Sequence, residues 1–480
     1  MSHINNFFER LLAANESDVV AIVNGEIRNS RQLCVSVAEL VTTLSSLPQQ
    51  KWLVWADSAY PFLVEFFALC LSGKQIVMPG NVQADYLKNI SGSFDAVLAD
   101  VAIPAVDSDK AVVHVKATET ESMEIGEAID VVKKAVDSLD DSAITLYTSG
   151  TTGEAKAINK TLGLLVEEVI AQQSMWADKV GNCSVVSTVG HQHIYGLLHY
   201  ALWPWYRRAP VVDPASHLAE EVFSLARMHA PSVLVSSPTH LHRLYAGLNE
   251  VDCIDAASGK PLFYSVFSSA GLLEKQKAGV IERCAGTSPI EIFGSTETGG
   301  VAWRQQSLQS EGDAQWESLA GVNVSRDTDS GCLSIQSRFM LENSYLMSDR
   351  VSEIRQGHFC LQGRADRIVK VEGKRLSLDE MLAKLSTHRY VGEARLLVLK
   401  KRREEVCAIV RLSESGKAAL NNHDKRQMNS ELRSCLLESF ELPLLPRRWR
   451  YVDEFPCDQQ GKVTQAALQT LFESVGGIGA

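Results

Sequence analysis

The sequence has no apolar run long enough to cross a bilayer. Its most apolar stretch, Phe62 to Ser72, is too short for a membrane span and contains Glu65. The first residues, MSHINNFFERLL, lack the basic start and long apolar core of a signal peptide. We therefore expect a cytoplasmic protein without a transmembrane segment.

Paired cysteines and a positive net charge are also missing. The 10 cysteines form no C-x-x-C pair and show no histidine spacing typical of zinc. In a chain of this size they imply no disulfide framework, so we expect buried free thiols. The formal net charge of −11 argues against a nucleic-acid partner bound through its phosphates, although it leaves room for a local basic patch.

The 480 residues are enough for two or more domains with large cores, and a hydrophobic content of 45% is ordinary for a globular protein. Strand and helix patterns alternate up to about residue 294, which predicts α/β layers with largely parallel sheets. The acidic stretch from Thr118 to Asp141 is expected to be an exposed connection. The predicted helices are 32–44, 61–71, 161–170, 197–203, 218–229 and 239–248, and the predicted strands are 52–55, 75–78, 94–98, 143–146, 184–188, 232–235, 263–267 and 290–293.

The pattern changes towards the C-terminus. Short strands are predicted from Gly321 to Cys360, followed by a helix at 378–385, a hairpin at 395–411, a long helix at 424–440 and a strand at 450–452. We expect a large domain over residues 1–365 and a small α+β domain over residues 366–480, with the boundary in the segment GRADR.

The segment Leu146 to Lys160, LYTSGTTGEAKAINK, has hydroxyl residues packed around Gly150 and Gly153, and Lys156 closes that run. Glycines allow a tight turn in which N–H groups and hydroxyls converge on an anion, and the lysine adds a compact charge. Between a predicted strand and a predicted helix, this composition indicates a nucleotide phosphate loop. It is not a Walker loop, because Ala157 follows the lysine where that pattern needs Ser or Thr. The alternative is a surface turn rich in Ser, Thr and Gly.

Four further polar segments follow along the chain, with a small-residue loop before them. Glu297 comes just after a strand, where ligands of open α/β sheets bind, and a carboxylate there can hold Mg²⁺. Each segment alone is an ordinary solvated turn. They are SSAGLL (268–273), FGSTETGG (293–300), YLMSDRV (345–351), GRADRIVKVEGKRLSLDE (363–380) and FPCDQQGKVT (455–464).

Together these segments resemble the motifs of the AMP-forming adenylate ligase superfamily, which includes acyl-CoA synthetases, aryl-acid ligases and peptide-synthetase adenylation domains. The resemblance extends from about Phe8 to Ala467, and the motifs fall in the family order. The sequence departs from the family pattern at Ala155 and Leu272, where proline is usual, and at Asp366, which comes one residue early.

The resemblance implies a role for each matching residue. Thr296 would donate to the α-phosphate, Asp349 would accept from the ribose hydroxyls, and Arg364 would contact ribose or phosphate. Glu297 would hold Mg²⁺ with Thr152, and Lys462 would be the catalytic lysine. The phosphate loop would comprise Thr148, Ser149, Gly150, Thr151, Thr152, Gly153 and Lys156, and the adenine site Ser269, Ala270, Gly271, Phe293, Gly294 and Ser295.

The resemblance also implies a reaction in two steps. ATP and an aryl or fatty acid would form an acyl-adenylate and pyrophosphate, and a thioester would follow, with CoA as the expected co-substrate. The small domain would turn about Asp366 between the steps, withdrawing Lys462 and bringing Gly373 to the active site. An acyl carrier protein is the alternative acceptor, and a non-catalytic nucleotide-binding regulator is the alternative of another class.

Three features are ambiguous. His193, in GHQHIYGL, resembles a family histidine near the acyl pocket, but a structural core histidine explains it as well. His191 and His193 form only a weak candidate metal pair. The basic runs Lys400 to Arg403 and Arg447 to Arg450 are either solvated faces or a site for the phosphates of CoA or an acidic carrier.

Overall fold

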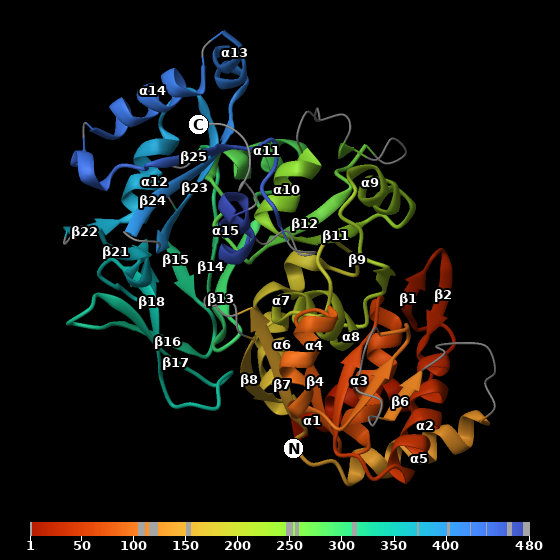
Figure 1. Ribbon diagram of the computed structural model, residues 1–480. Helices are drawn as coiled ribbons and strands as arrows, with labels where there is room; N and C mark the ends of the chain where they lie inside the picture. The colour runs from red at the N-terminus through yellow and green to blue at the C-terminus, as the bar shows by residue number, and fades with distance from the viewer. Residues whose placement is uncertain are drawn as a thin grey trace. The chain divides into compact units, whose positions relative to one another are not determined.

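The computed structural model describes the chain except for residues 1, 104–110, 115–122, 150–154, 246–252, 255–258, 310–313, 372–373, 401–403, 423, 438, 458–462 and 474–480. The chain forms two compact units. The first contains Met1–Asn323 and Ile335–Tyr345, and the second contains Val324–Ser334 and most of the chain from Leu346 onward. Together they give the expected large α/β part and smaller C-terminal α+β part (Figure 1). The functional boundary at residue 365 stays a prediction, because compactness alone does not locate a hinge.

A six-stranded sheet in the order β6-β5-β3-β4-β7-β8 organises the N-terminal part of the first unit. Its strands are parallel except for β8, which pairs antiparallel with β7. Alternate residues of β3 point to opposite faces, and one face carries an apolar cluster that α4 covers. The bounds are β3 Lys51–Trp55, β4 Gln75–Met78, β5 Ala96–Ala99, β6 Ala111–His114, β7 Ala143–Ser149, β8 Ala155–Thr161 and α4 Ala84–Ile90.

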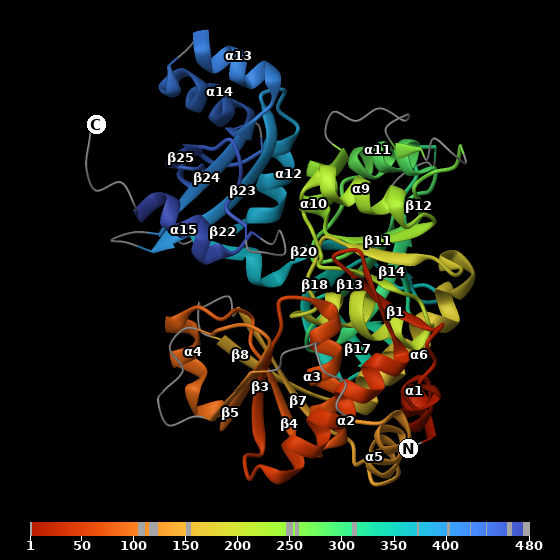
Figure 2. The ribbon, with the colours of Figure 1, turned by 90° about the vertical axis from the view of Figure 1, so that its right-hand side faces the viewer.

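The opposite face of this sheet is covered by α3 (Ala59–Leu71), every residue of which is buried. Next to α3 lie α2 (Ser30–Ser46) and α5 (Ile125–Asp137), as Figure 2 shows. The expectation of an exposed acidic connection over residues 118–141 was wrong for α5. Its Ala128, Val132 and Val136 are buried one helical turn apart, while its charged residues face outward.

The larger sheet of the first unit runs in the order β15-β14-β13-β12-β11-β9-β10-β1-β2. The strands from β13 to β1 are parallel, and β2, β14 and β15 pair antiparallel at the two sides. The bounds are β1 Val19–Val23, β2 Glu26–Asn29, β9 Ser184–Ser187, β10 Val211–Asp213, β11 Ser232–Ser236, β12 Phe263–Ser268, β13 Ile290–Ser295, β14 Gly299–Gln305 and β15 Trp316–Ser318.

Helices cover both faces of this sheet. On one face α9 (Ala219–Met228), α10 (Pro238–Tyr245) and α11 (Lys275–Ala285) bury an apolar cluster against β9, β11 and β12. On the other face, Trp176 and Trp203 pack edge-on against Phe267. Trp176 lies on α6 (Leu162–Val180), and Trp203 begins α8 (Trp203–Tyr206), which continues from α7 (Ile194–Gly196) and the π-helical η2 (Leu197–Leu202). Helix α1 (Ser2–Ala13) also belongs to the first unit.

In the second unit a three-stranded sheet, β23-β24-β25, has an apolar cluster on each face. Helices α12 and α14 cover one cluster and α15 the other. Antiparallel pairs β18–β20 and β21–β22 precede this sheet along the chain. From β16 onward the strands are β16 Val322–Arg326, β17 Cys332–Ser337, β18 Tyr345–Val351, β19 His358–Phe359, β20 Leu361–Arg364, β21 Ile368–Val371, β22 Lys374–Ser377, β23 Val391–Lys400, β24 Glu404–Leu412 and β25 Arg448–Tyr451. The helices are α12 Leu378–Ser386, α13 Glu414–Asn422, α14 Lys425–Leu437 and α15 Gln465–Glu473, with the short 3₁₀ turns η4 Ala365–Arg367 and η5 Leu442–Leu444. A further 3₁₀ turn, η1 Ser91–Ser93, lies in the first unit after α4.

Asp213 links the two sheets of the first unit. It ends β10, and its carboxylate accepts hydrogen bonds from the backbone N–H groups of Ala59 (2.8 Å) and Tyr60 (3.0 Å) at the start of α3. The residue before the helix, Ser58, makes no capping bond with its side chain. Asp213 therefore satisfies helix N–H groups that have no partner within α3.

We predict that Asp213→Ala destabilises the protein by about 2–3 kcal/mol, because buried helix N–H groups lose their acceptor. Urea unfolding followed by far-UV circular dichroism measures the change. Asp137→Ala, at the exposed end of α5, is the control and should change stability by less than about 0.5 kcal/mol. Equal effects of the two substitutions would contradict the capping role.

Candidate active site

The glycine-rich segment begins at the end of β7 and continues into β8. Thr148 lies opposite Lys156 in this antiparallel pair. Thr161 caps the following helix α6 by accepting from the N–H of Leu164 at 3.3 Å. The helix was expected here, but Lys156 lies on a strand that the sequence did not predict. Four of the loop residues, Gly150, Thr151, Thr152 and Gly153, lie outside the described residues.

Glu297 lies in the tight turn between β13 and β14, and it meets the lysine of the first motif. The Lys156 Nζ donates to Glu297 Oε1 at 2.6 Å. Burial alone would raise the pKa of the Glu297 carboxyl, but the lysine contact outweighs burial and the pKa is lowered. The same hydrogen bond raises the pKa of Lys156. Both groups are therefore charged at neutral pH, beside the proposed phosphate loop.

The turn itself is held by hydrogen bonds and by glycines. Ser295 N–H donates to the Thr298 hydroxyl at 3.1 Å, and Thr298 donates to the carbonyl of Gly299 at 2.9 Å. A Cβ added at Gly294 would lie 2.2 Å from the Gly299 carbonyl oxygen, so only glycine fits there. Thr296 is half-buried within the turn. The motif thus forms a rigid hairpin end that presents Glu297.

The expected adenine site lies at the ends of neighbouring strands. The Ser269 hydroxyl donates to the Ile292 carbonyl at 2.8 Å, which ties the end of β12 to β13. Ala270 adopts the left-handed backbone conformation (φ 69°), and Gly271 is exposed. The Phe293 ring packs against Trp316, with 5.5 Å between the ring centroids. The role of these residues towards adenine stays a prediction.

The expected ribose site is in the second unit. Arg364 forms a two-pronged pair with Asp366, with distances of 2.9 and 2.6 Å, and its third nitrogen donates to Asp349 Oδ2 at 3.1 Å. Arg364, Asp366 and Asp349 all lie within the second compact unit. Gly373 and Lys462 lie outside the described residues.

This contact shifts the pKa values of all three side chains. The hydrogen bond to Asp366 raises the pKa of the Arg364 guanidinium, and the same bond lowers the pKa of Asp366. Burial raises the pKa of the Asp349 carboxyl, and the arginine offsets part of that rise. The positive charge of Arg364 thus favours the ionised form of the buried Asp349 carboxylate, which accepts hydrogen bonds.

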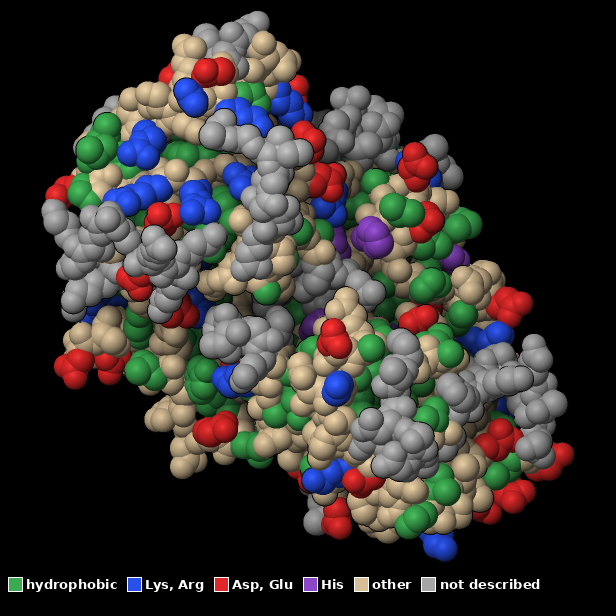
Figure 3. Space-filling view, in the orientation of Figure 1, with side chains coloured by type: hydrophobic (Ala, Val, Ile, Leu, Met, Phe, Trp, Pro, Cys, Tyr) green, Lys and Arg blue, Asp and Glu red, His purple; other side chains and the backbone are tan. Residues whose placement is uncertain are grey.

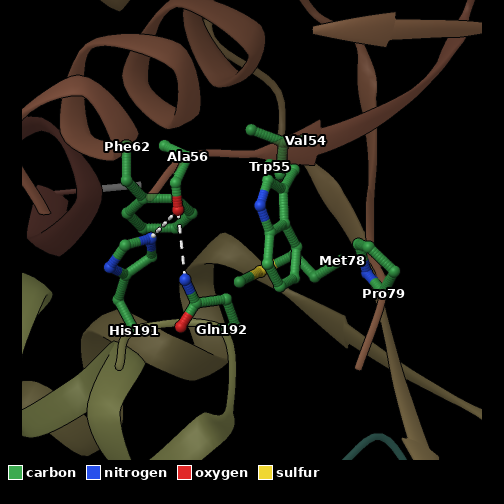
Figure 4. A pocket seen from close by; sticks show the side chains of 8 residues that line it. All are labelled: Val54, Trp55, Ala56, Phe62, Met78, Pro79, His191 and Gln192. Atoms are coloured by element: carbon green, nitrogen blue, oxygen red, sulfur yellow. Dashed lines mark hydrogen bonds between the residues drawn. The ribbon is translucent and has the colours of Figure 1, made fainter. Parts of the chain in front are cut away.

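The two candidate histidines have different surroundings. His191 Nε2 and Gln192 Nε2 both lie 3.1 Å from the Ala56 carbonyl oxygen, and the His191 ring packs on Phe62 (Figure 4). Burial lowers the pKa of His191 to about 3, so its ring is neutral. His193 precedes α7, and its carbonyl accepts from Leu197 N–H at 2.7 Å. Within the described part of the chain, no three His, Cys, Asp or Glu residues form a metal-binding group.

Lysines and arginines gather over the second unit, as Figure 3 shows. Of the basic run at 447–450, Arg448 pairs with Glu405 at 3.0 Å, and Arg450 donates to the Leu471 carbonyl at 3.0 Å. These two arginines therefore have partners within their own unit. A role for this run towards CoA or a carrier stays a prediction, and residues 401–403 of the other run are not described.

Two buried charged residues behind the Glu297 turn were missed by the sequence reasoning. The Lys160 Nζ donates to the carbonyls of Glu297 (3.0 Å) and Phe339 (2.6 Å). Glu168, on α6, accepts from Gly300 N–H at 2.7 Å. The sequence signal for Lys160 was the alternation on β8, in which Ile158 and Lys160 both face inward, and Glu168 on α6 had no such signal.

Comparison with known proteins agrees with this geometry. Residues 88–326 match the family described as AMP-binding enzyme. The chain belongs to this family. It is 24% identical to a 4-coumarate–CoA ligase of Cereibacter sphaeroides over 71% of this chain and 74% of that protein. It is 28% identical to a D-alanine–D-alanyl carrier protein ligase of Listeria monocytogenes, over 24% of this chain and 22% of that protein.

Solved structures share the fold of this AMP-binding enzyme. ATP-bound MatB from Rhodopseudomonas palustris matches with a TM-score of 0.75 at 16% identity, over 99% of this chain and all of that one. A benzoate CoA ligase from Burkholderia xenovorans matches with a TM-score of 0.72 at 16% identity, over 96% and 99%. In the described residues, no helix is long and apolar enough to cross a membrane.

The Lys156–Glu297 pair gives a pH-dependent prediction. Because the pKa of Glu297 is lowered from 4.5 in the folded protein, the pair stabilises the fold above that value and loses its effect as the pH falls through the lower folded pKa. We expect Lys156→Met to cost about 1 kcal/mol or less at pH 7, since the pair is partly exposed, and less at acid pH. Urea unfolding at several pH values measures this.

The control is the same lysine substitution in a Glu297→Gln background, where the cost should not vary with pH. A cost that stays constant from neutral to acid pH in both backgrounds would show that Lys156 stabilises the fold by some means other than its contact with the carboxylate.

Proposed function

We propose that this AMP-binding enzyme activates a carboxylic acid with ATP and then transfers the acyl group to a thiol, with CoA as the acceptor. A carboxylate oxygen attacks the α-phosphorus, and pyrophosphate leaves. The thiol sulfur then attacks the acyl carbonyl, AMP leaves, and the thiol proton is lost to solvent. The observation that carries the proposal is the contact of Lys156 with Glu297, which joins two separate family motifs.

The described residues fit the charges of this chemistry. A lysine at the phosphate loop neutralises phosphate charge as pyrophosphate departs. Glu297 is an ionised oxygen ligand of the kind Mg²⁺ prefers, with Thr152 as its expected companion, and the ion would neutralise the triphosphate. The Asp349 carboxylate can accept hydrogen bonds from the ribose hydroxyls, and the Arg364 guanidinium can donate to ribose or phosphate oxygens. Holding acid and ATP side by side replaces a bimolecular encounter with a positioned one.

The relatives support both thiol acceptors. One similar protein carries the name of a CoA ligase and another that of a carrier protein ligase. CoA is the first candidate because the match to the CoA ligase spans more of the chain. The presence of Glu297, Asp349 and Lys462 together argues against the non-catalytic alternative, since loss of turnover usually removes such residues.

The test is pyrophosphate release from ATP and Mg²⁺ with a panel of aryl and fatty acids, first without a thiol and then with CoA or a phosphopantetheinylated carrier. Acid-dependent release supports adenylation, and stimulation by one thiol identifies the acceptor. Measurable ATP binding without release for any acid, with or without either thiol, would favour the non-catalytic reading.

We predict that Lys462→Ala lowers acid-dependent pyrophosphate release at least about 100-fold while ATP affinity changes only a few-fold. A lysine that contacts the reacting groups only in the transition state contributes little to ground-state binding. Stopped-flow pyrophosphate detection and calorimetric ATP titration measure the two quantities. Lys417→Ala, an exposed lysine of the same unit paired only with Glu414 in the described contacts, is the control. Unchanged turnover in Lys462→Ala would refute its role.

A further inference from the structure

Two buried charged residues contact the turn that carries Glu297, and they come from different elements. Lys160 lies near the end of β8 and Glu168 lies on α6, and each is only 2% exposed. The Lys160 Nζ donates to the Glu297 carbonyl at 3.0 Å, and Glu168 Oε1 accepts from the Gly300 N–H at 2.7 Å. One charge therefore binds the middle of the turn, and the other binds the start of β14.

The backbone of the hairpin lies directly against the Glu168 carboxylate. Gly299 has a left-handed backbone conformation (φ 71°), and a Cβ added there would collide with Glu168 Oε2. A Cβ added at Gly300 would lie 2.6 Å from Leu319 Cδ1 and 3.2 Å from Glu168 Oε1. The two glycines thus allow the carboxylate to reach the main chain of the turn.

Lys160 also binds a second segment of the first unit. Its Nζ donates to the Phe339 carbonyl at 2.6 Å, just after β17. The neighbouring Arg338 lies over the Phe339 ring and pairs with Glu167 at 3.5 Å. The Lys160 ammonium therefore joins the Glu297 turn to the chain at 338–339, and adjacent residues of α6 bind both.

The two charges compensate each other's burial. Burial lowers the pKa of the Lys160 ammonium and raises the pKa of the Glu168 carboxyl, and each residue offsets part of the other's shift. Apolar side chains of similar volume often fill such a space at no loss of stability. What apolar side chains cannot do is bind a carbonyl and an N–H of the turn, and this is what the two charges do here.

We propose that Lys160 and Glu168 are positioning residues that fix the backbone of the turn and thereby the direction of the Glu297 carboxylate towards Mg²⁺; this rests on the proposed function. Lys160 acts on the carbonyl of Glu297 itself, and Glu168 acts three residues later. A turn held at both places has its carboxylate oriented before an ion arrives, which lowers the cost of binding the ion.

Hydrogen–deuterium exchange of the ligand-free protein tests the effect on the backbone. We expect amide exchange at residues 295–300 to accelerate at least about 10-fold in Lys160→Met and Glu168→Leu, because each loses a group that binds the turn. Exchange in the buried face of α2 is the internal reference, since global unfolding would accelerate both regions. An unchanged rate at 295–300, or equal acceleration in α2, would overturn the proposal.

Conservative variants separate the hydrogen bonds from the charges. Glu168→Gln keeps an acceptor oxygen at the same reach and should restore most of the protection of the Gly300 amide. Glu168→Asp keeps the charge but is shorter by one methylene, so it should exchange as fast as Glu168→Leu and replaces that variant if it does not fold. Lys160→Arg should restore part of the protection. Full protection in Glu168→Asp would contradict the role of the contact.

The Mg²⁺ concentration for half-maximal pyrophosphate release measures the effect on the carboxylate. At saturating ATP and acid, we expect it to rise at least about 10-fold in Lys160→Met and Glu168→Leu, and to return part of the way in Lys160→Arg and Glu168→Gln. A merely structural role would lower kcat without changing the Mg²⁺ requirement. Accelerated exchange with an unchanged Mg²⁺ requirement would therefore overturn the positioning role.

The proposed function can fail separately from this inference. If the wild-type protein releases no pyrophosphate with any acid, the proposed function fails, and the Mg²⁺ dependence of ATP binding, followed by calorimetry, replaces turnover as the second measurement. The exchange measurement needs neither ATP nor an acid.

Two buried residues of the same unit are matched controls. Lys74 is 5% exposed and donates to the Leu47 carbonyl at 2.8 Å. Glu65, on α3, is fully buried, and neither of its carboxyl oxygens has a hydrogen-bond partner among the described residues. Lys74→Met and Glu65→Leu should leave both the exchange at 295–300 and the Mg²⁺ requirement unchanged. Acceleration by either control to the same extent would show that the turn responds to any lost buried charge, and the inference would fail.

Discussion

The candidate site of the first unit depends on a lysine and a glutamate that lie 141 positions apart in the chain. Lys156 comes from the outer strand of the six-stranded sheet, and Glu297 comes from a hairpin of the larger sheet. Their contact brings the glycine-rich segment and the hairpin motif to one place, although each sheet has its own core. The anchoring of α3 by Asp213 also joins the two sheets, so the Lys156–Glu297 ion pair and the hydrogen bonds of Asp213 to backbone N–H groups both connect them.

The buried charges behind this contact show how the site is held. Lys160 and Glu168 do not pair with each other at close distance; each binds main-chain atoms of the hairpin instead. Burial lowers the pKa of Lys160 and raises that of Glu168, which is the expected direction when water is removed from a charge. A charge that binds backbone carbonyls and N–H groups constrains the backbone itself, and this is how a turn with little apolar surface becomes rigid.

Much of the fold was predictable because its elements have strong local patterns. The 61–71 segment, apolar except for Glu65, became most of α3, and the short β-branched runs became the parallel strands β4, β9 and β11. The strand β8 was missed because its sequence, AKAINKT, alternates polar with apolar residues weakly and directly follows a glycine-rich loop. The helix α5 was missed because its many charges hide the buried residues at positions 128, 132 and 136.

The site was predictable where motifs carry it and not where tertiary contacts do. Glu297, Asp349 and Arg364 could be named because each lies in a recognisable segment. The resemblance could not foresee that Arg364 binds both Asp349 and Asp366, since that depends on the register of β18 and β20. Lys160 ends the glycine-rich segment without an assigned role and Glu168 lies outside every motif, so only the folded chain shows what their side chains contact.

The glycines of the hairpin also affect how the motif is inherited. Gly294 has no room for a side chain beside the backbone of Gly299, and Gly299 and Gly300 lie against a buried carboxylate. These positions are constrained by packing alone, so a descendant that had lost its chemistry would still keep them in order to fold. Glu297, whose carboxylate extends away from this packing to Lys156, is under no such constraint. Across related sequences, the persistence of that one carboxylate would therefore reflect its contact with Lys156 and its chemistry, whereas the glycines around it would persist through packing alone.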